Sequence, residues 1–91
     1  MGKALDIDAL QRLINAVSKY EGELSTNRAI MSNAANLCSQ AMGNDVLSQK
    51  HIQKLNDAIK SLDAAIDKAG SVLAALQYDL AMAKEVADSG N

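Results

Sequence analysis

Besides its acidic residues, the chain has one histidine and one cysteine whose side chains could bind a metal or act in catalysis, His51 and Cys38. A zinc site needs three or four His, Cys or carboxylate ligands. A catalytic histidine needs a nucleophile or a carboxylate fixed beside it. The sequence has one histidine and one cysteine, and neither lies in a recognisable motif. We therefore expect no catalytic residue, no bound metal and no cofactor, and we predict that the protein is not an enzyme.

The other polar candidates also have simpler interpretations. Acidic pairs such as Asp63 and Asp67 have charged neighbours in the sequence and belong to a solvated face. Cys38 is expected to pack as a small apolar residue. Tyr78 is expected on the outward side of a helix, where a tyrosine can anchor a partner protein. It can equally lie flat on its own helix, so we keep it as a candidate partner contact.

Composition indicates one small helical domain. The chain has 91 residues, of which 48% are hydrophobic and 2% aromatic, and it contains no proline. The apolar residues are mainly Ala, Leu, Ile, Val and Met, which helices accommodate well. The net charge of -2 is mixed along the chain, whereas a nucleic-acid-binding protein should have a basic face. No apolar run is long enough to span a membrane.

The beginning of the chain lacks the continuous apolar stretch of a Sec-type signal peptide, because Asp6, Asp8 and Arg12 interrupt it. We expect a cytoplasmic protein, with export by a route that needs no such peptide as the alternative.

Apolar residues in the first half recur at alternating intervals of three and four, which is the pattern of a heptad repeat. Asn27 occupies the one polar position of this series. The members are Leu10, Leu13, Val17, Tyr20, Leu24, Met31, Ala34, Cys38 and Ala41. Because Tyr20 lies in the series, we predict that its ring belongs to the core, and an amide at Asn27 could fix the register of a bundle.

The second half follows the same rule without interruption. Its series is Ile52, Leu55, Ile59, Leu62, Ile66, Ala69, Leu73, Leu76, Leu80, Ala83 and Ala87. Apolar residues also precede many members of both series, for example Ala16 and Ile30 in the first half and Val72 in the second. Such a wide apolar face suits a bundle in which each helix contacts two neighbours.

We predict an all-α fold, a single domain over 1–91 that forms an antiparallel two-helix hairpin and assembles as a dimeric four-helix bundle. The predicted association face consists of Leu10, Leu13, Val17, Leu24, Met31, Ile52, Leu55, Ile59, Leu62, Ile66, Leu73, Leu76 and Leu80. The partner is a second copy or another helical protein, since the same apolar face serves both.

The predicted boundaries are a first helix over about 6–42, a turn over 43–47, a second helix over about 48–87 and a frayed tail over 88–91.

Short polar residues mark the helix ends. Asp6 can cap the first helix, and Ser48 can cap the second, although Asn44 or Asp45 could do so earlier. Gly43, Asn44 and Asp45 form the predicted turn, with Gly43 suited to a left-handed conformation after the first helix. Gly22 and Gly70 should fall at about the same height of the hairpin, where they permit a bend or a close approach of the backbones, or are ordinary exposed substitutions.

Length, the two helices of similar size and the glycine at the bend resemble the WXG proteins, the ESAT-6-like superfamily of bacterial type VII secretion. The stretch that matches the family's W-x-G is Ala41-Met42-Gly43, so the glycine is present and alanine replaces tryptophan. The family also places an acidic residue four positions after a tyrosine near the end of the second helix. Here Tyr78 is followed at that interval by Met82.

The resemblance implies a small secreted substrate, or an adaptor that pairs with the helical N-terminal domain of a larger LXG-type toxin. The absence of the acidic residue after Tyr78 favours the adaptor. One alternative is a cytosolic helical scaffold or chaperone with no link to export. Another is a filament subunit like the needle proteins of type III secretion, but those usually bend at P-x-x-P, and this chain has no proline.

Overall fold

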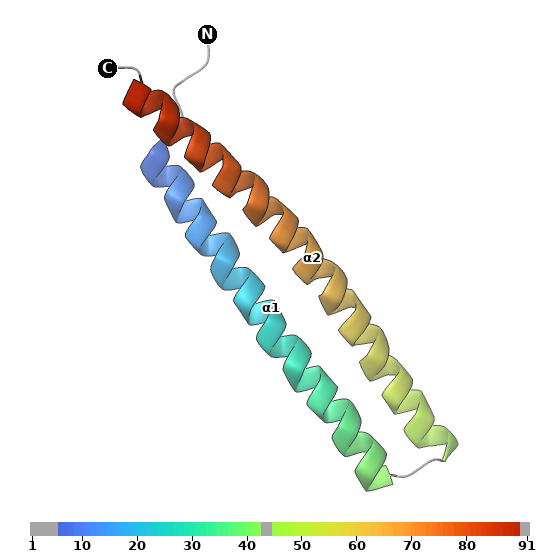
Figure 1. Cartoon of the computed structure of the whole chain (residues 1–91). Helices are drawn as coiled ribbons and strands as arrows, with labels where there is room; N and C mark the ends of the chain where they lie inside the picture. The colour runs from blue at the N-terminus through green and yellow to red at the C-terminus, as the bar shows by residue number, and fades with distance from the viewer. Residues whose placement is uncertain (1–5, 43–44, 90–91) are drawn as a thin grey trace.

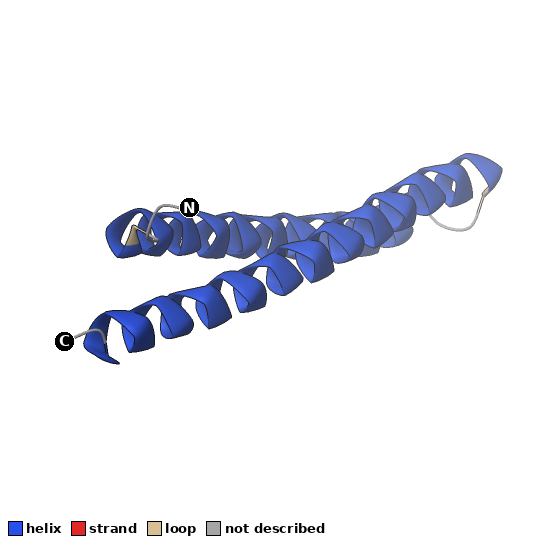
Figure 2. Cartoon of the chain, turned by 90° about the horizontal axis from the view of Figure 1, so that it is seen from above, coloured by secondary structure: helices blue, strands red, loops and turns tan. Residues whose placement is uncertain are grey.

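The computed structural model describes residues 6–42 and 45–89. Two long α-helices, α1 (Ile7–Met42) and α2 (Val46–Ser89), run antiparallel, so that the start of α1 and the end of α2 lie at the same end of the molecule (Figure 1). The rod measures 69 × 19 × 14 Å. Seen from above, after a quarter turn from the view of Figure 1, the two helices cross at a shallow angle (Figure 2). The predicted all-α helical hairpin is confirmed.

Asp6 caps α1, as the sequence predicts. The backbone N–H of Ala9 donates to Asp6 Oδ1 at 3.0 Å, and the N–H of Leu10 donates to the Asp6 carbonyl oxygen at 2.9 Å. The carboxylate thus satisfies an N–H group of the first turn that has no partner within the helix.

Asp45, one of the two earlier alternatives, caps α2, and Ser48 does not. The N–H of Ser48 donates to Asp45 Oδ1 at 2.8 Å, and the N–H of Gln49 donates to the Asp45 carbonyl oxygen at 3.0 Å. The helix therefore begins at Val46, within the segment predicted as turn. An Asp caps at least as well as a Ser, and its charge also favours the positive end of the helix dipole. The other predicted turn residues, Gly43 and Asn44, lie outside the described residues.

The end of α2 extends further than the sequence predicts. The helix continues through Asp88 to Ser89, and the Ser89 hydroxyl donates to the carbonyl oxygen of Val86 at 3.3 Å. Fraying from Asp88 is therefore wrong for these two residues. Between Gly70 and Gly90 the sequence has neither glycine nor proline, so the backbone hydrogen bonds can continue without an apolar anchor.

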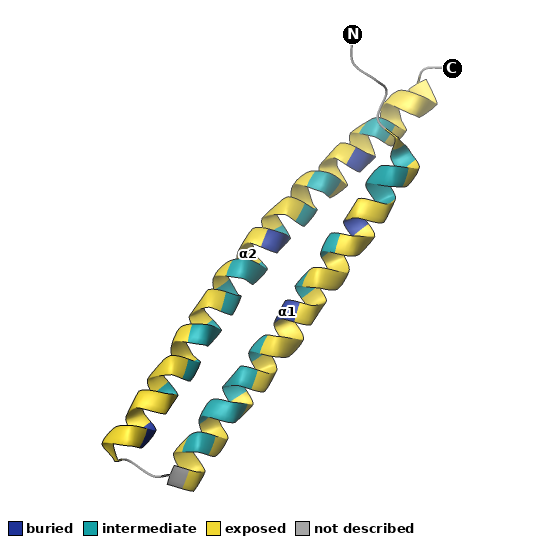
Figure 3. Ribbon diagram, turned by 180° about the vertical axis from the view of Figure 1, so that it is seen from behind, coloured by how far each residue is buried: buried dark blue, intermediate teal, exposed yellow. Residues whose placement is uncertain are grey.

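The core is a narrow strip between the helices (Figure 3). Its buried apolar residues are Ile14, Leu24, Ala69 and Leu80, flanked by half-buried neighbours along both inner faces. Fully burying one aliphatic side chain contributes about 1.5–3 kcal/mol, and a two-helix strip buries only a few of them completely. A chain of this size with so thin a core has little stability to spare.

Candidate association surface

The inward row of α2 matches the predicted series closely. Its members are Ile52, Leu55, Ile59, Leu62, Ile66, Ala69, Leu73, Leu76, Leu80 and Ala83, and each is buried or half-buried. The exception is Ala87, which is exposed because α2 there extends beyond the first residue of α1. We call these ten residues the α2 row.

The inward row of α1 differs from the predicted series at every second position. Its members are Ile7, Leu10, Ile14, Val17, Glu21, Leu24, Arg28, Met31, Ala35 and Cys38, all buried or half-buried. We call them the inner row. Ile14 is only 6% exposed, whereas Leu13 is 48% and Tyr20 54% exposed. The predictions of Tyr20 in the core and Asn27 at a core-facing position are therefore wrong within the hairpin.

The two charged members of the inner row explain this difference. Arg28 Nε donates to Asp63 Oδ1 at 2.5 Å, and Arg28 Nη2 donates to Asp63 Oδ2 at 3.5 Å. The hydrogen bond from this guanidinium, together with the charge of Asp63, raises the pKa of Arg28. Both side chains remain almost half exposed, so the pair lies at the edge of the strip, where water still reaches it.

Glu21 occupies the inner row beside a glycine. Its Oε2 lies 3.0 Å from the position that a Cβ on Gly70 would take. The absent side chain of Gly70 therefore leaves room for the Glu21 carboxylate between the helices. Gly22, in contrast, has nothing within 4 Å of such a Cβ. No backbone atom of α1 lies within 4 Å of the Cβ position at Gly70, so the expected close approach of the backbones does not occur there, and Gly22 is an exposed glycine.

A second heptad row runs along α1 next to the inner row. Its members are Leu13, Ala16, Tyr20, Glu23, Asn27, Ile30, Ala34 and Leu37, and we call them the outer row. Ile30 is 59% and Leu37 55% exposed. Consecutive residues are about 100° apart around a helix, so the outer row lies beside one edge of the inner row and the Arg28–Asp63 pair beside the other edge. One side of the hairpin thus carries the ion pair, and the other carries the outer row, which is apolar except at Glu23 and Asn27; we call this second side the apolar face.

The apolar face extends from α1 onto α2. A hollow of about 350 Å³ between the helices is lined by Val17, Tyr20, Ala65, Lys68, Ala69 and Val72. Val72 is half exposed there. Tyr20 of the outer row and Val72 of α2 therefore border one continuous, largely apolar surface. An exposed strip of this kind marks an interaction site more often than an accidental surface.

The predicted association face divides between two roles. Leu13 belongs to the outer row, while the remaining members lie in the inner row or the α2 row and hold the two helices of the hairpin together. Tyr78, the candidate partner contact, is 66% exposed on the outward side of α2.

The structure brings no cluster of potential ligands together in the part of the chain that it describes. His51 is exposed at the start of α2, and Cys38 is half-buried in the inner row near the end of α1. Within 6–42 and 45–89, no group of three His, Cys, Asp or Glu residues could hold a metal ion. Over the same residues, neither helix contains a stretch that is long and apolar enough to cross a bilayer.

The inner row of α1 and the ion pair were missed as features of the fold, although part of the signal for the inner row is in the sequence. Ile7, Leu10, Ile14 and Val17 follow the same intervals of three and four as the predicted series. The next positions of that series are Glu21 and Arg28, and because both are charged, the apolar pattern of the inner row is interrupted in the sequence.

No protein-family model, curated protein or solved structure matches this chain.

Proposed function

We propose that this protein acts by pairing its hairpin with helices of another chain in a four-helix bundle, as a WXG-like component of a type VII secretion system. In that role it is a secreted substrate, or the targeting adaptor of a larger LXG-type toxin. The observation that carries the proposal is the outer row of α1. Large apolar side chains such as Leu13, Ile30 and Leu37 are about half exposed along the rod.

Burying this row would remove apolar surface from water, which favours association. The hairpin already uses its inner row and α2 row internally, so the outer row is the surface left for a partner. The outer row lies on a different side of α1 from the inner row. Helix α1 can therefore contact two neighbouring helices, as each helix does in a four-helix bundle. The resemblance in length, hairpin pattern and bend glycine then connects this pairing with type VII export.

A cytosolic helical scaffold or chaperone is the second candidate. Two substitutions relative to the family pattern favour it, Ala41 in place of the tryptophan and Met82 in place of the acidic residue after Tyr78. Both candidates use the same apolar face, so export is what separates them.

The test is fractionation of the native organism with an antibody against this chain. Supernatant and cytosol are compared, with a strictly cytosolic enzyme as the lysis control, and proteins that co-purify are identified by mass spectrometry. We expect the protein in the supernatant, or bound to a large toxin with a helical N-terminal domain. Detection only in the cytosol without such a toxin would contradict the secretion proposal and favour the scaffold.

Two matched variants sharpen the test. Ile30→Asp changes the outer row and should abolish co-purification of the partner, because a charge would be buried in the bundle. Val86→Asp alters a residue of similar shape that is also exposed, at 65%, but lies near the end of α2 away from the outer row. It should leave the partner bound. Equal loss in both variants would show that the outer row is not the pairing surface.

A further inference from the structure

The outer row of α1 has nearly the same pattern when it is read in either direction. From its first member to its last, the side chains are large, small, large, polar, polar, large, small and large. A helix with such a pattern can pair with an antiparallel copy of itself. We propose that α1 binds α1 of a second copy of this chain, antiparallel, about a two-fold axis at the height of Ser25.

This symmetry fixes which residues face one another. The symmetry-related layers are Leu13 with Leu37 of the second copy, Ala16 with Ala34, Tyr20 with Ile30, and Glu23 with Asn27, each occurring twice. The outer row alternates between two heptad positions, one containing Leu13 and Tyr20 and the other Ala16 and Glu23. Each layer pairs a residue of one position with a residue of the other, as in antiparallel coiled coils. The contact is isologous, so the same patch on both chains closes the assembly as a dimer.

A shift by one heptad in either direction destroys this match. One shift would place the Tyr20 ring against Glu23 of the second copy, and the other would place Asn27 against Ile30. Either arrangement leaves a polar group against an apolar one and removes terminal layers from the contact. Burial of an unpaired polar or charged group is costly, so the pattern selects a single register.

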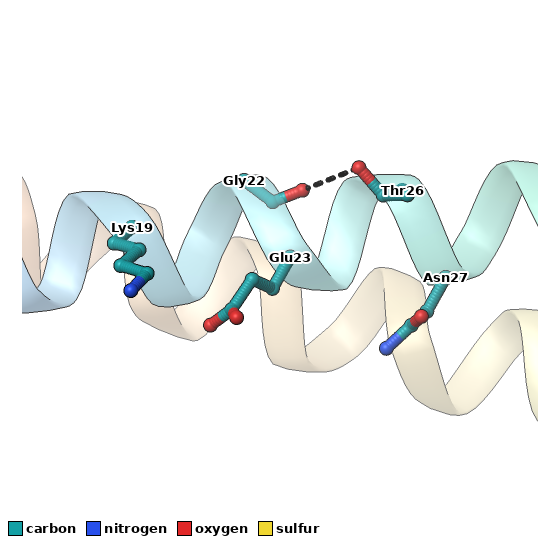
Figure 4. Close-up of a pocket in the computed structure, with 5 residues that line it drawn as sticks. All are labelled: Lys19, Gly22, Glu23, Thr26 and Asn27. Atoms are coloured by element: carbon teal, nitrogen blue, oxygen red, sulfur yellow. Dashed lines mark hydrogen bonds between the residues drawn. The ribbon is translucent and has the colours of Figure 1, made fainter.

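The polar centre of the row supports the same register. Glu23 and Asn27 border a shallow hollow of about 490 Å³, together with Lys19, Gly22 and Thr26. Figure 4 shows Lys19, Glu23 and Asn27 following one another along one side of α1, while the Thr26 hydroxyl bonds to the Gly22 carbonyl oxygen at 3.1 Å. In the dimer, each Glu23 carboxylate can accept a hydrogen bond from the Asn27 amide of the other chain. Such a polar layer typically fixes register at some cost in stability.

The surface area is consistent with a dimer. The single chain has an accessible surface of 6703 Å² and a mass of 9.6 kDa, whereas a compact monomer of that mass has about 5,100 Å². A stable interface of standard size removes about 800 Å² from each partner. The excess surface of the hairpin is thus large enough to supply such an interface.

The corresponding row of α2 is a poorer candidate. Its apolar members Ala65 and Val72 are separated by Lys68, and Asp79 follows one heptad after Val72. The charges interrupt the apolar strip, and the row does not repeat in reverse. The pairing helix is therefore α1, and α2 contributes the flank of the apolar face.

This inference rests on the bundle pairing in the proposed function and specifies the partner as a second copy. The first measurement is the mass of the purified full chain by light scattering across the micromolar range. We expect twice the 9.6 kDa of one chain. Ile30→Asp should raise the dissociation constant at least tenfold, and Val86→Asp should leave the mass unchanged. Circular dichroism of Ile30→Asp shows whether the helices persist.

The second measurement tests the register by disulfide trapping. Two separately tagged chains, both carrying Cys38→Ala, are mixed under mild oxidation. The pair Ala16→Cys with Ala34→Cys should cross-link at least tenfold faster than the pair Ala16→Cys with Ala41→Cys, which is one heptad out of register. All these substitutions are small, so they leave the large apolar layers in place.

A mass of one chain throughout the micromolar range would overturn the inference, and so would equal cross-linking of the two pairs. A monomer that is still exported with a helical toxin would remove the inference and leave the proposed function standing. A dimer with the expected cross-link that remains in the cytosol without a toxin would support the inference and contradict the type VII assignment.

Discussion

The two helices of this hairpin differ in how clearly each one defines its own inner face. The α2 row is an unbroken apolar series, and the structure uses it as the sequence predicts. On α1 two apolar rows lie side by side, and the structure places the one containing Glu21 and Arg28 against α2. A single apolar row therefore determines its own orientation, whereas a helix with two rows takes its orientation from its neighbours.

The largest expected effect comes from a charge in the α2 row. Ile59→Asp should unfold the hairpin, because an unpaired carboxylate would have to enter the strip between the helices at a cost of several kcal/mol. Loss of the far-ultraviolet helical signal is the measurement. Ser61→Asp, at an exposed position two residues along, should keep the signal. If Ile59→Asp melted at the same temperature as Ser61→Asp, the α2 row would be assigned wrongly.

The next effect separates the two rows of α1 at adjacent positions. Ile14→Ala should lower the free energy of unfolding by about 2–4 kcal/mol, since it opens a cavity at a buried site. Leu13→Ala should weaken the dimer, so its effect on stability should be largest at high protein concentration, where the unmodified chain is paired, and small in dilute solution, where association contributes least. Chemical denaturation of both variants at two concentrations makes the comparison. A larger loss at Leu13 than at Ile14 when the chain is dilute would reverse the order of the rows.

The two helix glycines give a smaller effect of opposite sign. Gly22→Ala should stabilise the protein by about 1 kcal/mol, because alanine favours the helix and nothing lies within 4 Å of the new Cβ. Gly70→Ala should gain less, since the Glu21 carboxylate must move away from a contact of 3.0 Å. Thermal melting of both variants tests this order. An equal gain at both positions would mean that Glu21 does not use the space at Gly70.

The smallest effect concerns the cap of α2. The hydrogen bond from the Ser48 N–H lowers the pKa of Asp45 below its ordinary value. A carboxylate with a lowered pKa in the folded state contributes stability above its unfolded pKa, near 3.8, and this contribution is lost as the pH falls through the folded value.

Asp45→Asn is the matched variant, because Asn also caps helices and does not titrate. The difference in melting temperature between the two proteins should be constant at neutral pH and should change only as the pH falls below about 4. A difference that stays constant into strong acid would show that the Asp45 charge adds nothing to the cap.

The sequence predicted the hairpin and the α2 row because both follow from local periodicity and helix propensity. It also identified Asp6 as the cap of α1. It missed the inner row of α1 because this row contains two charged residues. Arg28 can lie there because it pairs with Asp63, and Glu21 can lie there because Gly70 leaves space for it. Asp63 and Gly70 both belong to the other helix. A pattern read along one helix does not contain these partners. The register of α2 against α1 has to be known before the charges can be paired.

The sequence left the cap of α2 open between Ser48 and the earlier Asn44 or Asp45, for a local reason. Asp45 and Ser48 are both good capping residues and lie three positions apart, so either could begin the helix. Asp45 places its carboxylate on the N–H of Ser48 itself. Ser48 then becomes a buried residue of the first turn, and Val46 and Leu47 belong to the helix.

The central claim is that α1 makes contacts through two heptad rows. The inner row contacts α2, and the outer row contacts another copy of the chain. The most direct test is thermal unfolding of the unmodified protein across a hundredfold range of concentration. If a second copy covers the outer row, mass action requires the melting temperature to rise as the protein becomes more concentrated. A melting temperature that does not change with concentration would contradict the account, because the hairpin would then be complete as a single chain.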